Sequence, residues 1–113
     1  MANVIKWANA LSTRASLEAA VAEVADCLEN SLPSKADLGL VFISSAYASE
    51  YPRLIPLLQE RLSLPVLIGC GGSGIIGMNT NGLPVEVEGG PALSLSQACL
   101  PDVSVQSFHI SGD

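Results

Sequence analysis

Apolar residues recur at two different spacings in the first part of the chain. Residues 4–11 (VIKWANAL) mix β-branched, aromatic and small residues, which predicts a first strand. Four apolar residues then recur at helical spacing: Leu17, Val21, Val24 and Leu28. Because Ser16 stands where an N-cap is expected, we predict an amphipathic helix from Ser16 to about Asn30.

The alternation of strand and helix continues in the middle of the chain. Residues 38–44 (LGLVFIS) form a continuous apolar run of strand length, typical of a strand buried on both faces. A second helix is predicted by three leucines at four-residue spacing: Leu54, Leu58 and Leu62. Pro52 suits a first turn but Pro56 does not, so we expect a late or distorted start. Residues 65–69 (PVLIG) predict a third strand.

The pattern changes after the third strand. Three segments alternate, or nearly alternate, between apolar and polar residues: 83–88, 92–99 and 103–110. Gly and Pro separate these segments, which predicts strands of an antiparallel meander. We therefore expect an α/β fold with a mixed sheet. Its β-α-β-α-β start with parallel strands is followed by an antiparallel three-strand meander.

Length and composition limit the chain to a single domain, residues 1–113. Of its 113 residues, 49% are apolar and only 14% are charged, which is an apolar composition for so small a soluble domain. Such a composition predicts apolar surface that faces a partner or a further part of the same protein.

Charge and hydropathy exclude several classes of protein. Only five scattered Lys and Arg residues and a net charge of -6 argue against nucleic-acid binding. The stretch between Leu62 and Val85 is uncharged, but Gly, Ser, Asn and Pro interrupt it too often for a membrane span. Without an evident secretory signal, we expect a cytoplasmic protein. Three widely spaced cysteines and a single histidine predict reduced thiols and no metal site.

The glycine-rich motif PVLIGCGGSGIIG spans residues 65–77. It fits GxGxxG twice, but no helix is predicted after it to hold a pyrophosphate, which disfavours a dinucleotide site. Cys70 lies between glycines at a strand end, where free backbone amides would activate a thiol as a nucleophile. A small buried thiol is the favoured interpretation of this residue, and we expect no enzyme.

Polar or glycine-rich residues follow each of the first three predicted strands. In a parallel sheet such ends lie along one edge, where open α/β folds bind small molecules. Amides and hydroxyls there suit a carboxylate, with Arg14 or Arg53 as the counter-charge. The alternative is that these loops are polar only because they lie at the surface. The candidate ligand-binding residues are Ser12, Ser45, Tyr47, Cys70, Gly71, Gly72, Ser73 and Gly74.

The order of four segments resembles the N-terminal part of FIST domain proteins over most of the chain: WANALSTRASLEAAV, DLGLVFISSAYASEYPRLIPLL, PVLIGCGGSGIIG and VEVEGGPALSLSQACLP. The most specific features are the Gly69-Cys70 pair and the paired glutamates before GPALSL. The resemblance implies a non-catalytic sensory module in signal transduction that binds an amino acid or another small carboxylate and needs no cofactor. Family members often carry Ser at the position of Gly71, so Ser73 is the candidate hydroxyl here.

The resemblance also implies more chain, because the FIST region continues past the equivalent of Asp113. Three explanations stay open: a truncated form, a fragment, or a piece that is completed by another chain or a homo-oligomer. The alternative function is a structural or interaction subunit that docks on a larger assembly, in which the glycines only turn the chain.

Overall fold

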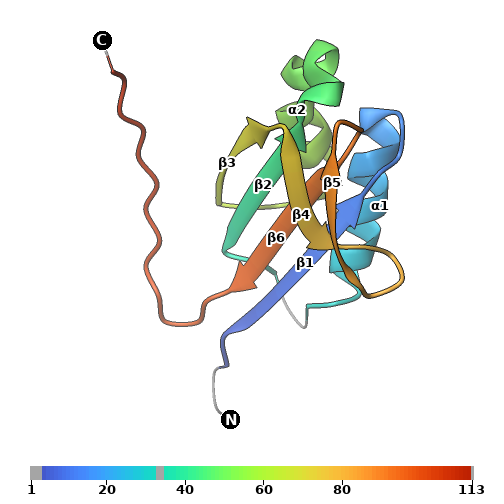
Figure 1. The fold of residues 1–113 in the computed structure, drawn as a ribbon. Helices are drawn as coiled ribbons and strands as arrows, with labels where there is room; N and C mark the ends of the chain where they lie inside the picture. The colour runs from blue at the N-terminus through green and yellow to red at the C-terminus, as the bar shows by residue number, and fades with distance from the viewer. Residues whose placement is uncertain (1–3, 33–34, 113) are drawn as a thin grey trace.

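The computed structural model describes residues 4–32 and 35–112 (Figure 1). Nine elements follow one another along the chain: β1 (Lys6–Ser12), α1 (Leu17–Glu29), β2 (Leu38–Ser44), the 3-10 helix η1 (Ser45–Glu50), α2 (Tyr51–Arg61), β3 (Val66–Gly72), β4 (Gly74–Met78), β5 (Pro84–Glu88) and β6 (Leu93–Cys99). No helix within these described ranges is long and apolar enough to cross a membrane.

Four of the strands form a mixed sheet in the order β1-β6-β2-β3. β2 and β3 are parallel, with Leu38 opposite Val66. β6 lies between β1 and β2 and runs antiparallel to both of them. The predicted mixed α/β fold is therefore confirmed, but the first two strands are not neighbours in the sheet.

Local sequence signals explain where the helices begin. The hydroxyl oxygen of Ser16 accepts a hydrogen bond from the Ala19 amide at 3.0 Å and caps α1 as predicted. The start of α2 is late, because the residues after β2 first form η1. Pro52 then occupies the first turn of α2, and Pro56 lies inside the helix.

The predicted three-strand meander is wrong. β5 pairs with β4 in a separate two-stranded sheet, whereas β6 returns to the main sheet. β4 was not expected, because the glycine-rich sequence conceals its alternation. Residues 103–110 are extended but form no strand, since no described strand lies beside them to accept their backbone hydrogen bonds. His109, predicted on a strand, therefore lies in an exposed extended segment.

The elements are arranged in three layers (Figure 1). α1 and α2 cover one face of the four-stranded sheet, and the β4–β5 hairpin lies on part of the other. The main core fills the space under the helices and includes Leu17, Val24, Leu28, Leu93 and Leu95. A smaller cluster under the hairpin joins Leu11, Ile75 and Ala92.

Candidate functional site

The carboxyl ends of β1, β2 and β3 lie at the same edge of the sheet (Figure 1). β1 and β2 each run antiparallel to β6, and β3 is parallel to β2, so the three strands point the same way. The segments that follow these strands hold the predicted ligand-binding residues that lie outside the strands: Ser45, Tyr47 and Ser73. This edge, formed by the carboxyl ends of the three strands, is the candidate site.

Two of the predicted residues have buried side chains that shape the loop after β1. The hydroxyl oxygen of Ser12 accepts a hydrogen bond from the Arg14 amide at 3.2 Å. The hydroxyl of Tyr47, in η1, donates to the carbonyl oxygen of Arg14. Burial raises the pKa of Tyr47, and the nearby Glu23 carboxylate raises it further. Both side chains fix the course of this loop from within.

The end of β2 depends on Ser44, which is not among the residues predicted from the sequence. The hydroxyl of Ser44 is buried, donates to the Gly90 carbonyl at 2.7 Å and accepts from the Ala46 amide at 3.0 Å. Ser44 thereby caps η1 and ties the β5–β6 connection to the sheet. Ser45, the predicted residue, is exposed at the first position of η1. A serine directly before a helix was the available signal for Ser44.

The glycine-rich motif forms two strands instead of a loop. β3 continues to Gly72, and β4 begins at Gly74 after the single connecting residue Ser73. Because side chains alternate along β3, Cys70 and Gly71 face opposite sides of the sheet. Cys70 is exposed, so the expected buried thiol is wrong; it lies on an edge strand, on the face opposite the helices. Gly71 faces α2, where an added Cβ would lie 3.2 Å from the Tyr51 hydroxyl.

Two glycines of this motif are required by close packing. A Cβ at Gly69 would lie 1.8 Å from the carbonyl oxygen of Val41 in the neighbouring strand. A Cβ at Gly77 would lie 2.9 Å from Oδ1 of Asn9, Cβ of Leu11 and Oγ of Ser94. These two positions let β3 pair with β2 and let β4 sit on the sheet, and both roles are structural.

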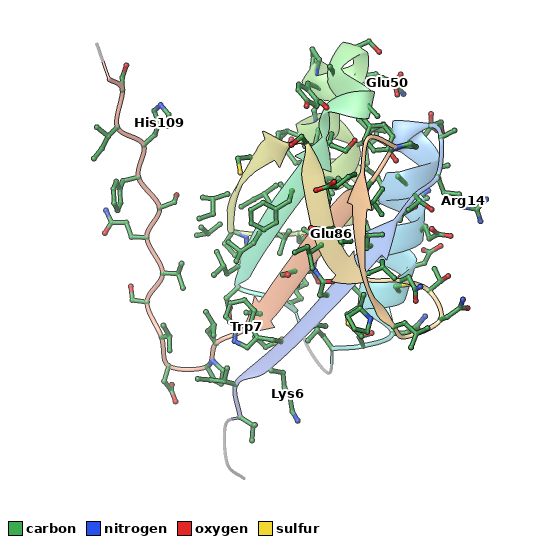
Figure 2. The ribbon with its side chains drawn as sticks, viewed as in Figure 1. Lys6, Trp7, Arg14, Glu50, Glu86 and His109 are labelled. Carbon is green, nitrogen blue, oxygen red and sulfur yellow. The ribbon has the colours of Figure 1, made fainter. Side chains whose placement is uncertain are left out.

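Charged side chains of both signs lie beside the candidate site. Arg14 forms an ion pair with Glu23 at 3.1 Å between Nε and Oε2. Arg53 reaches Glu50 at 3.1 Å and Glu18 at 3.3 Å. Arg14 and Glu50 lie at this end of the molecule, near the start of α1 and the end of η1 (Figure 2). Each predicted counter-charge therefore already has a carboxylate beside it.

A cavity of about 590 Å³ lies at the opposite end of the strands, where β2 and β3 begin. It is lined by the C-terminal ends of α1 and α2 and by Gln97 of β6, and no predicted site residue contributes to it. A smaller groove of about 200 Å³ runs between α2 and the start of β3. Within residues 4–32 and 35–112, no group of three or more His, Cys, Asp or Glu side chains is placed to hold a metal ion.

Comparison with known proteins gives a match to a family model. The model of the FIST N domain matches residues 37–111, from the residue before β2 through β6 and the extended segment that follows. No curated protein and no solved structure matches the chain.

Proposed function

Because the chain belongs to the FIST N domain family, we propose that it is a sensory module that binds a small ligand at the carboxyl ends of β1, β2 and β3. The observation that carries the proposal is the convergence of these three strand ends with two arginines at one edge. Signalling output then comes from other domains or partners. Three cysteines at widely spaced positions favour the reducing environment of the cytoplasm.

An amino acid is the ligand that suits the charges best. Arg53 is held by two carboxylates, so a ligand with only a negative charge would leave Glu18 and Glu50 repelling it. A zwitterion supplies a carboxylate for the guanidinium and an ammonium group for the displaced glutamate. The displaced glutamate then has a new cation beside it, which a simple carboxylate does not supply.

The predicted residues take two roles in this proposal. The exposed residues at the edge contact the ligand: Ser45, Gly71, Ser73 and Gly74, with Cys70 and Gly72 beside them in β3. Ser12 and Tyr47 act as positioning residues, because they hold the loop that carries Arg14.

The test is thermal unfolding of the chain with each amino acid and with a panel of organic acids. A ligand at 100 times its dissociation constant adds about 2.7 kcal/mol to the free energy of unfolding. We expect Arg53→Gln to abolish the shift and Arg61→Gln to keep it, because Arg61 is a comparably exposed arginine at the other end of α2. A shift that survives in Arg53→Gln and in Arg14→Gln would sink the proposed site.

The second candidate function is an interaction subunit. The observation in its favour is the apolar surface on the face of the sheet opposite the helices, where Trp7, Phe42 and Ile68 are exposed. Unfolding that no compound shifts, together with stable association of the chain, would favour this candidate over a ligand sensor.

A further inference from the structure

β3 is a free edge of the main sheet. It pairs with β2 on one side, and no described residue pairs with it on the other. An unpaired edge presents a row of N–H and C=O groups to which another strand can add. β1, at the other edge, begins with the exposed Lys6 (Figure 2), a residue type that discourages such pairing. β3 has no charged residue.

Both flanks of the β3 edge are apolar. On the helix side lies the groove of about 200 Å³, whose lining includes Ile55, Leu62 and Leu64. On the opposite side Ile68 is 48% exposed and Phe42, in the neighbouring strand, is 39% exposed. A strand added here would therefore bury apolar side chains on both of its faces.

The segment of residues 103–110, here called the tail, has the pattern that such a position requires. Alternation puts Val103 and Val105 on one face and Phe108 and Ile110 on the other. Phe108 is 83% exposed and Ile110 is 78% exposed. No backbone hydrogen bond joins residues 104–110 to the rest of the described chain, and the tail runs apart from the sheet on the β3 side (Figure 1).

We propose that the tail of a second copy of this chain adds as a strand to the free edge of β3, and that the exchange is reciprocal. Each copy has one tail and one edge, so a two-fold dimer satisfies both. The eight-residue tail spans about 26 Å and the seven residues of β3 about 23 Å at strand rise. Neither Val103 to Ile110 nor β3 carries Asp, Glu, Lys or Arg, so no like charges meet within this contact.

The chain's own tail is a poorer occupant of the same edge. It leaves the sheet from β6, which lies two strands inside the β3 edge. After the turn at Asp102, whose φ is 63°, it passes to the β3 side of the sheet but runs apart from that edge, and no backbone hydrogen bond joins its residues 104–110 to β3 (Figure 1). The single chain therefore leaves both its tail and its β3 edge open to a second copy. The inference shares Cys70, Gly71 and Gly72 of β3 with the proposed ligand site, but its test needs no ligand, so the two proposals can fail separately.

The test is sedimentation equilibrium over a range of concentrations, together with hydrogen exchange of the tail amides. We expect a mass of twice 11.7 kDa and tail amides that are protected only in the dimer. The double variant Phe108→Asp/Ile110→Asp should raise the dissociation constant at least about 100-fold. The control is Ile76→Asp/Leu83→Asp, which adds the same charge at two exposed apolar positions of the β4–β5 hairpin and its turn and should leave the dimer intact.

Four outcomes would overturn the proposal. A monomer at all concentrations with unprotected tail amides means that nothing occupies the edge. A monomer with protected tail amides means that the chain's own tail does. Masses that grow beyond the dimer mean open-ended addition, and equal dimerisation of the tail variant and the wild type places the contact elsewhere. A cooperative thermal transition of the tail variant shows that it is folded, since the tail lies outside both core clusters; loss of the dimer should lower the midpoint at high protein concentration.

Discussion

The two faces of the four-stranded sheet differ in how they are covered. On one face, α1 and α2 enclose Leu17, Leu93 and Leu95 completely. On the other, the β4–β5 hairpin covers Leu11 but leaves Trp7 54% exposed. Most of the buried apolar surface therefore lies on the helix side, and the opposite side is open to further contacts.

The two coverings are also attached by different chemistry. The helices rest on apolar side chains, whereas the hairpin rests on polar side chains as well as on a small apolar cluster. Oδ1 of Asn9 accepts a hydrogen bond from the Met78 amide at 2.8 Å, and its Nδ2 donates to the hydroxyls of Ser94 and Ser96 at 3.0 and 2.9 Å. A small apolar cluster and a glycine contact complete the attachment, so we expect the hairpin to separate from the sheet more readily than the helices do.

The largest difference between the faces should appear on truncating an apolar side chain. Leu95→Ala removes a fully buried side chain of the main core and should lower the free energy of unfolding by about 2–5 kcal/mol. Ile76→Ala removes a similar volume from the exposed side of the hairpin and should change it by about 0.5 kcal/mol or less. Urea unfolding at one protein concentration measures both; equal losses would show that the hairpin layer is as important as the helix side.

A smaller effect should follow from lifting the hairpin. Gly77→Ala places a Cβ 2.9 Å from Leu11 Cβ and from the Asn9 side chain that holds Met78. We expect the free energy that holds the hairpin on the sheet to fall by about 1–3 kcal/mol. Hydrogen exchange should become faster in β4 and β5 and stay unchanged in β2 and β6. Gly90→Ala is the control, because its nearest contact would be an ordinary 3.8 Å. Uniform exchange across all strands would contradict the idea of a separately attached hairpin.

The smallest effect concerns Tyr47 and appears at high pH. Its pKa in the folded protein is raised above the ordinary value of about 10, chiefly by burial. The folded state then holds the proton more tightly than the unfolded state, so stability is lost as the pH rises above about 10. Tyr47→Phe should cost about 1 kcal/mol at neutral pH, because the Arg14 carbonyl loses its donor. It should also flatten the decline in unfolding free energy above pH 10; parallel curves would contradict this role.

Local patterns predicted the elements better than their arrangement. The run at residues 38–44 and the cap at Ser16 gave the observed β2 and the start of α1, because both depend on neighbours in sequence. The position of β6 between β1 and β2 depends on pairing between distant segments, which alternation alone does not encode. β4 was missed because glycine normally signals a turn, whereas Gly77 is needed for contact with the sheet.

The candidate site shows the same division. Parallel strand direction correctly predicted that the three strand ends meet at one edge. The directions of individual side chains were not predicted. Tyr47 points inward to the Arg14 carbonyl, and Cys70 and Gly71 fall on opposite faces because β3 continues three residues beyond its predicted end at Gly69. Extending the alternation of β3 through the glycines would have separated these two residues.

The central place of β6 also bears on how the chain reaches its native state. The residues of β1 and β2 are synthesised early, yet both strands pair with β6, the last strand along the chain. Lys6 lies opposite Cys99, and Leu38 lies opposite Ala98. The sheet cannot assemble until nearly the whole chain is available, and its pairing is dominated by contacts between distant residues. Such topologies fold slowly. We therefore expect nascent chains that end before Leu93 to lack a stable sheet, and the first two strands to need protection from aggregation until β6 joins them.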